Sequence, residues 1–483
     1  MRIAVTQRII GLLLMTFSTT MLPPVVVSLI FADGSAPAFV YGFAVTLAAG
    51  CLVWLPVRHD RREPRLRDGF LIVAGFWLVL GSFGAMPLLF ASEPSLRIID
   101  ALFEAISGLT TTGATVLTGL DSLPPAVLWY RQQLQWLGGI GIIVLAIAVL
   151  PMLGVGGMQL YRAETPGPVK DNKLTPRITE TAKALFLVYL GLTTACAIAY
   201  FAAGMSLFDA ICHSFSTIAI GGFSTHDLSI GHFDSTLIDL VAVVFMFIAG
   251  INFSLHFVAW RNLSLAHYFS DPETRAYANL LAGMLIFVVL TLYLQGQYAL
   301  LSDNVVNGLF QVVSVATTTG FTTTDFSAWP GALPVLLLFS SFVGGCVGST
   351  GGGMKVMRVL LLYKQGLREV RRLVHPSAEM PVKLGNNPVP ARAIDAVWGF
   401  FGVYVVVFVA MMTVLLATGL DQVTAFSAIA ASLNNLGPGL GDVATGFGGV
   451  NDVAKAVCIV AMLLGRLEIF TLLVLVTPTF WRP

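Results

Sequence analysis

The sequence predicts an all-α polytopic membrane protein, built from four pseudo-symmetric repeats and two additional N-terminal transmembrane helices. The composition is the first observation behind this prediction. Of 483 residues, 56% are hydrophobic and 11% are charged, whereas soluble proteins carry about 25% charged residues. The net charge of +1 gives no indication of a nucleic-acid partner, and a lipid bilayer is the expected environment.

Apolar runs of two lengths are the second observation. A helix needs roughly 20 apolar residues to cross the hydrocarbon core. Runs long enough lie near 9–31, 37–57, 69–91, 126–150, 182–203, 237–260, 278–297, 332–362, 394–418 and 453–478. Four shorter segments lie near 98–112, 207–221, 305–319 and 422–436. Their length predicts re-entrant or buried helices, which lipid tolerates only where they line water or are packed in protein.

Lysine and arginine predict the orientation, because they accumulate in cytoplasmic loops. The connections "RHDRREPRLR" and 363–372 are rich in both residues, and so is 162–177. The connections "THDLSIGHFDST" and "TTTDFSAWPGA" contain neither. We therefore expect a multi-pass protein with both termini cytoplasmic, whose four short segments open to the outside.

A fourfold repeat is the third observation. The four short segments align on one glycine each, and the spacings between these glycines are 109, 98 and 117 residues. A polar residue lies 13 residues before each glycine and is expected to be a helix N-cap. The glycines are Gly113, Gly222, Gly320 and Gly437, and the expected caps are Asp100, Asp209, Asn307 and Thr424.

Four such units around one axis would form helix–pore-loop–helix repeats enclosing one ion pore. The C-terminal carbonyls of a half-helix favour a cation, and glycine lets consecutive carbonyls face the axis. Rings of carbonyls can replace the hydration shell of an alkali cation. The expected ligands are the backbone oxygens of Thr111, Thr112, Ile220, Gly221, Thr318, Thr319, Asn435 and Leu436. The alternative is a packing seam of small residues.

Acids follow the glycines in every repeat, and they are either an outer cation-attracting ring or solvated loop residues. They are Asp121, Asp227, Asp325 and Asp442. The expected organisation is 1–67 N-terminal two-helix extension, 68–160 first pore repeat, 161–265 second, 266–375 third and 376–483 fourth.

The eighth long run is interrupted by "GGCVGSTGGGMK", residues 344–355. So glycine-rich a stretch disfavours a continuous helix, and broken membrane helices usually occur at transport or gating sites. We expect a movable plug below the third filter loop, and the alternative is a helix-packing seam. Its gating candidates are Gly345, Gly348, Gly351, Gly352, Gly353 and Lys355. Met354 stands where a phosphate-binding loop requires lysine, so no organic cofactor is expected.

Charged residues inside apolar runs are costly and indicate function. Arg466, in "GRLEIFT", is expected to face the pore below the filter as a barrier to cations. The alternative is snorkelling to the cytoplasmic edge. Arg131 and Lys455 are weaker cases, and Glu104 is expected to brace the filter.

The strings "TTTGAT", "AIGGFSTHD", "TTTGFTTTDF", "GGCVGSTGGGMKVMR" and "GRLEIFT" resemble the Trk/Ktr/HKT superfamily of potassium transporters. The resemblance covers nearly the whole chain and is closest to the bacterial TrkH branch, which has two helices before the first repeat. It implies potassium uptake across the bacterial inner membrane, a homodimer, and a cytosolic ring of nucleotide-binding regulatory subunits like TrkA. It also implies that 344–355 is an intramembrane gating loop and that Arg466 is the pore-blocking arginine.

Within this resemblance, Gly113 fits the potassium-selective pattern, whereas plant relatives with serine there favour sodium. The fourth copy, "LNNLGPGL", departs most from the threonine pattern.

The leading interpretation is a potassium-conducting pore gated from the cytoplasm, with potassium as the transported ion. A secondary transporter is the first alternative, although its repeats are usually inverted and these run in the same direction. A proton- or sodium-coupled potassium symporter on the same fold also stays open. An enzyme is not expected, because no cluster of acid, base and nucleophile is seen. The roles of His226, Asp227, His232 and Asp234 are not assigned by the sequence.

Overall fold

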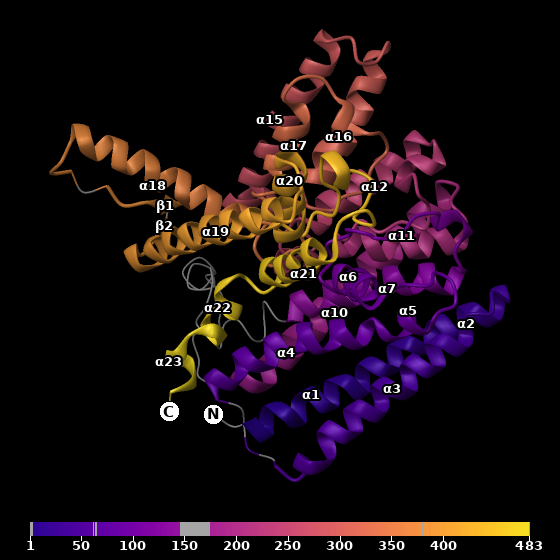
Figure 1. Ribbon diagram of the computed structural model, residues 1–483. Coiled ribbons are helices and arrows are strands. Elements are labelled where there is room, and N and C mark those ends of the chain that lie inside the picture. The colour runs from indigo at the N-terminus through magenta and orange to yellow at the C-terminus, as the bar shows by residue number, and fades with distance from the viewer. Residues whose placement is uncertain are drawn as a thin grey trace.

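The computed structural model is almost wholly helical (Figure 1) and describes residues 3–60, 62, 65–144, 174–378, 380–385 and 387–482. The expected boundary between the first and second repeats, at 160 and 161, lies outside the described residues. So do Arg162, Lys170 and Lys173 of the predicted basic connection.

An N-terminal helical hairpin precedes the repeats. Its first arm is α1 (Ile3–Ser18), η1 (Thr19–Met21) and α2 (Leu22–Phe31), and its second is α3 (Ala36–Trp54) with η2 (Leu55–Val57). Two glycines allow the arms to approach closely. A Cβ on Gly11 would lie 2.8 Å from Trp54 Cβ, and one on Gly50 would lie 2.8 Å from Met15 Cγ. Small residues at such contacts are how helices associate in lipid.

Four units follow, each with a long helix, a short helix and a second helix. The long helices are α4 (Leu66–Gly84) with α5 (Met86–Phe90), α10 (Leu174–Ala202), α15 (Pro272–Leu294) and α19 (Ala391–Ala417). The short helices are α6 (Ile98–Leu109), α11 (Leu207–Ala219), α16 (Leu301–Ala316) and α20 (Gln422–Leu433). The second helices are α7 (Pro125–Val144), α12 (Thr236–Ala249) with α13 (Phe253–Asn262), α17 (Leu333–Ser340) with α18 (Val356–Val374), and α21 (Asp452–Arg466) with α22 (Phe470–Val476).

Smaller elements connect these helices. The outer loops carry η3 (Leu120–Ser122), η5 (Ser229–Phe233), η6 (Phe326–Ala328) and η7 (Gly441–Val443). Elsewhere lie α14 (Ala266–Ser270), α23 (Pro478–Trp481) and an antiparallel hairpin of β1 (Lys383–Leu384) and β2 (Asn387–Pro388), in which Lys383 pairs with Pro388.

The predicted short segments are confirmed as helices, and they are buried. Every residue from Phe103 to Leu109 in α6 is buried, and so is every residue from Ser427 to Leu433 in α20. The long helices instead expose apolar side chains such as Ile198, Ile286 and Val406. The short helices therefore form the centre of the molecule, and the long helices present its lipid-facing surface.

Membrane spans agree only in part with the sequence. In the described residues, six helices are long and apolar enough to cross a bilayer, and two bent pairs also qualify. The expected break between α17 and α18 is present. The continuous runs predicted at 237–260 and 453–478 are wrong, because α12 and α13 meet at 96° and α21 and α22 at 113°.

The break between α12 and α13 has a tertiary cause. The N–H of Cys346 donates to the Gly250 carbonyl (2.8 Å), and the N–H of Phe253 donates to the Gly348 carbonyl (3.1 Å). Backbone groups freed at the bend are thus satisfied by the glycine-rich segment, as buried backbone requires. Local sequence carries little sign of a bond made about 100 residues away.

The N-cap prediction was also wrong. Asp100, Asp209 and Thr424 occupy the third position of their helices, and Asn307 lies further inside α16. Ser206 and Asp421 are the capping side chains of α11 and α20. Ser206 Oγ accepts from the Asp209 N–H (3.0 Å) and donates to the Asp209 carboxylate (2.7 Å). In α11 and α20, the N-cap is therefore a polar residue one turn before the predicted one.

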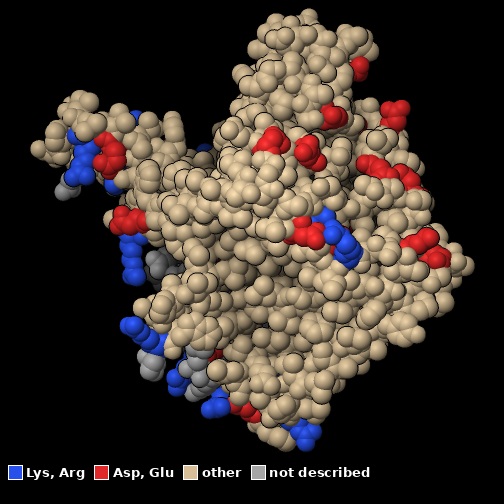
Figure 2. Space-filling model, viewed as in Figure 1, with Lys and Arg blue, Asp and Glu red and all other residues tan. Residues whose placement is uncertain are grey.

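Surface charge is divided between the two ends of the molecule. In Figure 2, Lys and Arg gather mostly on the left, at the chain ends below and on the α18 arm above, whereas Asp and Glu predominate at the upper right. A broad band almost free of charge lies between them. Such a band is the surface expected of a protein seated in a bilayer.

Gly11→Leu is expected to lower the free energy of unfolding of the purified protein by about 1–3 kcal/mol, because an added side chain would separate α1 from α3. The measurement is a melting curve in detergent, with Gly283→Leu as the matched control. No atom lies within 4 Å of a Cβ built on Gly283. Equal melting temperatures for the two variants would contradict this packing.

Candidate functional site

All four short helices end in the same way. Two residues before each glycine, the backbone is left-handed, with φ of 52°, 53°, 68° and 54° at Thr111, Ile220, Thr318 and Asn435. The next N–H donates 2.8 Å back to the carbonyl five residues earlier in every repeat, for example Thr112 to Ser107. This pattern is a Schellman motif, which usually has glycine or asparagine at the left-handed position. Three β-branched residues there are held against their own preference.

The four glycines close a ring. A Cβ on Gly113 would lie less than 3.0 Å from the Gly221 carbonyl oxygen, and the same holds for Gly222 with Thr319. It holds again for Gly320 with Leu436 and for Gly437 with Thr112. Each repeat thus presses its glycine against the carbonyl that precedes the glycine of the next repeat. The four loops converge on one axis in chain order, and any side chain at these glycines would disrupt the contact.

The carbonyls before the glycines are mostly free of hydrogen bonds. Of the eight oxygens predicted as ligands, only that of Gly221 accepts a hydrogen bond from a residue that the structure describes. All eight residues are buried. Buried carbonyls are normally paired, so the arrangement concentrates partial negative charge and suits a cation. The structure thus brings the predicted oxygens together.

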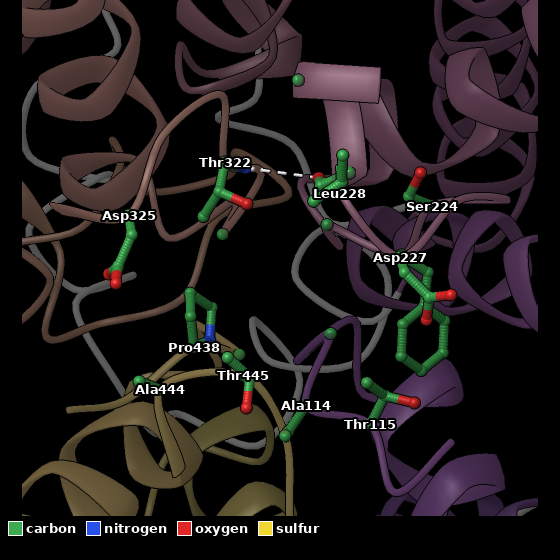
Figure 3. Close-up of a pocket in the computed structure, with 18 of the residues that line it drawn as sticks. Ala114, Thr115, Ser224, Asp227, Leu228, Thr322, Asp325, Pro438, Ala444 and Thr445 are labelled. Carbon is green, nitrogen blue, oxygen red and sulfur yellow. Dashed lines mark hydrogen bonds between the residues drawn. The ribbon is translucent and has the colours of Figure 1, made fainter. Parts of the chain in front are cut away.

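A cavity of about 320 Å³ opens directly outside this ring. All four glycines line it, and loops from all four repeats surround it in Figure 3. Asp227 and Asp325 line it as well, whereas Asp121 and Asp442 do not. A hydrogen bond from Thr322 N–H to Ser229 Oγ (3.3 Å) joins the third loop to the second across one side.

Polar side chains on the short helices hold the returning loops. Glu104, His213 and Gln311 each lie nine residues before the glycine of their repeat. Their side chains contact the loop that follows that glycine. Glu104 accepts from Thr115 Oγ1 (3.0 Å) and Val116 N–H (3.0 Å). His213 bonds Ser224 Oγ (2.9 Å), and Gln311 Nε2 donates to the Thr324 carbonyl (3.2 Å). In the fourth repeat, Ser427 has this role: its Oγ donates to the Leu440 carbonyl and accepts from the Leu440 N–H.

Two buried ion pairs, one within the first repeat and one between the first and the fourth, brace the loops. Arg131 Nε lies 2.7 Å from the Glu104 carboxylate, and its Nη1 donates to the Ser224 carbonyl (3.1 Å) in the second repeat. Lys455 Nζ lies 2.7 Å from Asp100, so the fourth repeat is tied to the first. The bracing expected of Glu104 is present. Removing one partner of such a pair leaves a buried charge unpaired, at a cost of about 3–5 kcal/mol.

Gln135 is a site residue that the sequence interpretation missed. Its Nε2 donates to the Gly221 carbonyl (2.6 Å) and its Oε1 accepts from the Phe223 N–H (3.1 Å). A Cβ on Gly221 would overlap the Gln135 amide. The equivalent positions Thr112 and Thr319 instead bond the threonine two residues earlier. Gln135 therefore fills the space of a side chain absent from the second repeat. Its signal was the polar string "RQQLQ" in an apolar run.

The glycine-rich segment lies against the inner ends of three short helices. Thr350 Oγ1 donates to the Ile218 carbonyl (2.8 Å), the Gly352 N–H to Thr318 Oγ1 (2.7 Å) and the Gly353 N–H to the Asn434 carbonyl (3.1 Å). A Cβ on Gly352 would collide with that same Asn434 carbonyl. Glycine is thus required where the segment passes closest to the ring. The segment therefore links α11, α16 and α20 through hydrogen bonds at their inner ends.

The flanks of this segment are anchored by a second residue that the sequence interpretation missed. Glu273 of α15 is buried, and its Oε1 accepts from the N–H groups of Val347 (2.8 Å) and Met357 (3.1 Å). Lys355, with φ of 79°, donates to the Gly351 carbonyl. A single carboxylate therefore holds both ends of the loop. The only sign of Glu273 in the sequence was an acidic residue at the start of an apolar run.

Arg466 is buried at the end of α21 and touches the segment from the fourth repeat. Its Nη1 donates to the Thr350 carbonyl (2.9 Å), while Nε and Nη2 have no hydrogen-bond partner among the described residues. Glu468 turns away and pairs with Arg358 of α18 (2.6 Å). No carboxylate of the described part of the chain pairs with this buried guanidinium, so its positive charge lies beside the glycine-rich segment. Arg466 does not snorkel to the surface.

Comparison with known proteins agrees with this geometry. A family model described as TrkH, cation transport protein, matches residues 35–482. The chain belongs to the TrkH family.

Relatives in this family match along their full lengths. "Trk system potassium uptake protein TrkH" of Halomonas elongata is 59% identical over 482 residues, covering 100% of each chain. The Vibrio parahaemolyticus protein of the same name is 60% identical over 479 residues, covering 98% of each. The crystal structure of the potassium transporter TrkH from Vibrio parahaemolyticus superposes with a TM-score of 0.92 at 55% identity, covering 100% of each chain. The polytopic all-α fold predicted from the sequence is confirmed.

Gly221→Ala is expected to lower the melting temperature in detergent, because its Cβ would overlap the Gln135 amide. The double variant Gly221→Ala/Gln135→Ala removes that overlap and should recover part of the loss. For residues in contact the coupling should be about 0.5–3 kcal/mol. Additive effects of the two substitutions would show that they do not share this space.

Proposed function

We propose that the chain takes up potassium across the bacterial inner membrane through a selectivity filter of backbone carbonyls. In this proposal, the glycine-rich loop 344–355 and Arg466 gate the pore, and a cytosolic nucleotide-binding subunit controls them. The chain is a transporter rather than an enzyme, and it binds no organic cofactor. Each of the four repeats from residue 68 onward contributes one quarter of the pore.

The closed ring of four glycines is the observation that carries the proposal. Each glycine abuts the carbonyl of the next repeat, so the free oxygens are held at a fixed separation around one axis. Oxygens arranged in this way can replace the water around a dehydrated alkali cation. The proposed ligands are the carbonyls of the two residues before each glycine. The names of the relatives, which state potassium uptake, indicate which cation.

The gate proposal is supported by what lies below the ring. The loop bonds to the inner ends of three short helices, and Arg466 bonds to the loop from the fourth. A cation leaving the filter inward would meet this obstruction and a buried positive charge. Movement of the loop and of Arg466 together would open the path. The proposed gating residues are therefore Gly345, Gly348, Gly351, Gly352, Gly353, Lys355 and Arg466.

A basic arm supports the proposal of cytosolic partners. In Figure 1, α18 and the β1–β2 hairpin project away from the helical bundle, on the side of the chain ends. The arm carries Lys364, Arg368, Arg371 and Arg372, and it exposes Val370 and Leu373. We propose that it contacts a second copy of the chain or the regulatory ring of TrkA-like subunits. Both termini are then cytoplasmic, in agreement with the charge division in Figure 2.

Cation flux into proteoliposomes tests the filter. The native chain should pass potassium and rubidium in preference to sodium and lithium. Gly113→Ser should lower the potassium-to-sodium ratio about tenfold, equivalent to about 1.4 kcal/mol, because φ of 82° and the Gly221 carbonyl both exclude a side chain there. Equal flux of all four ions in the native chain would contradict the filter.

The same assay separates the two transport modes. Flux driven by a potassium gradient alone supports a pore. An absolute requirement for a proton or sodium gradient would instead favour the coupled symporter.

Arg466→Gln should raise basal potassium flux in proteoliposomes without a regulatory subunit, because it removes the buried charge below the ring. An increase of about tenfold corresponds to a barrier lowered by about 1.4 kcal/mol. Arg261→Gln is the control, since Arg261 is exposed at the end of α13. Unchanged flux in Arg466→Gln would remove Arg466 from the gate.

A further inference from the structure

Two histidines and an aspartate meet at the outer mouth, where the proposed filter assigns them no part. Asp121 lies in η3 of the first repeat, and His226 and His232 lie in the outer loop of the second. One ligand atom from each of the three lies within 4.8 Å of the other two. His226 also lines the cavity outside the glycine ring. The cluster therefore joins two repeats at the entrance to the pore.

The geometry of the cluster is close to that of a metal site. His226 Nδ1 bonds to Asp121 Oδ1, and His232 Nδ1 lies 3.9 Å from the same oxygen. The two imidazole rings are parallel, with centroids 3.5 Å apart. Ligands of a tetrahedral zinc ion lie about 2.0–2.1 Å from the metal, so their mutual separation is about 3.4 Å. A rotation of His232 out of the stack would bring both nitrogens and the carboxylate to one point.

The surroundings permit this rotation. The side chains of His232 and Asp121 are 42% and 48% exposed, so they can reorient, whereas His226 is 18% exposed and anchored. His226 Nε2 has no hydrogen-bond partner among the described residues and lies 3.5 Å from the Asp209 carboxylate. A carboxylate behind a ligating histidine is the usual arrangement that orients such a ligand. The cluster thus has three ligands and an orienting acid.

Electrostatics at this position favours a cation. The Asp121 carboxylate bonds to His226 Nδ1, and the Asp209 carboxylate lies 3.5 Å from Nε2 of the same ring. Two carboxylates this close to the imidazoles attract a cation.

We propose that Asp121, His226 and His232 form a binding site for a divalent transition metal such as Zn²⁺, and that the bound metal lowers ion flux. Two imidazoles and one carboxylate are ligands that suit Zn²⁺. The site lies beside the cavity through which cations would enter, and a divalent charge there repels them. Binding would also tie the loops that follow Gly113 and Gly222 more tightly together. The effect on ion flux rests on the proposed conduction pathway, whereas metal binding itself does not.

Direct binding is the first test, made on protein purified without a histidine tag at pH 8. Zn²⁺ titrated calorimetrically should bind with one equivalent per chain in the native protein. His226→Gln/His232→Gln should lose that equivalent, and His232→Gln alone should weaken it by at least about tenfold. His375→Gln is the control, because His375 is exposed beyond the end of α18. Unchanged binding in the double variant would overturn the proposal.

Flux in the presence of external Zn²⁺ is the second test. Micromolar Zn²⁺ should reduce rubidium flux several-fold in the native protein and in His375→Gln, but not in His232→Gln. If the cluster only ties the loops together, no equivalent of Zn²⁺ binds and the Zn²⁺ titration of native flux stays flat. Binding without any effect on flux would overturn the regulatory half of the proposal alone. Absence of flux in every protein would count against the pore, while the calorimetric result would still decide the metal site.

Discussion

Eight main-chain carbonyls are the constraint on which the rest of the structure depends, because they are buried in the middle of a membrane protein and almost all lack a donor among the described residues. Such oxygens are unfavourable in an apolar interior unless they meet a donor or a cation. Four Schellman ends turn the chain so that these oxygens are free, and four glycines bring the loops into contact. The short helices that carry them are buried on almost every side, so the surrounding helices serve chiefly to hold this ring.

The ring is symmetric in its backbone and asymmetric in its supports. The first repeat is braced by the Glu104–Arg131 pair, the second by His213 and by the Gln135 amide, and the third by Gln311. The fourth, whose threonine pattern is lost, uses Ser427, while Asn435 Nδ2 donates to Thr112 Oγ1 in the first repeat (2.9 Å). The backbone geometry is therefore kept while the side chains that maintain it differ. This is why the departure of "LNNLGPGL" from the pattern leaves the ring closed.

The asymmetry below the ring has a related origin. Breaks in the second helices of the second, third and fourth repeats all meet at the glycine-rich segment. Gly250 supplies a carbonyl to it, and Arg466 donates to it. The segment exchanges backbone hydrogen bonds with the α12–α13 break, and its Thr350 carbonyl accepts from Arg466 at the α21–α22 break. The loop proposed as the gate is held by hydrogen bonds to α11, α16 and α20 of the same three repeats.

The sequence by itself determined what local pattern can carry: the apolar runs, the short helices, the glycine register and the carbonyls expected beside it. The short helices and the glycine register are confirmed because each depends on residues within one or two turns of helix. The runs at 237–260 and 453–478 are broken, and the carbonyls expected as ligands stay a prediction. Only the tertiary structure decided that α12 and α21 are bent, that Gln135 fills the space beside Gly221, that Glu273 anchors the loop, and that two stacked histidines face Asp121. Each of these depends on contacts between residues from about 70 to more than 100 positions apart, and no periodicity within one segment reports such contacts.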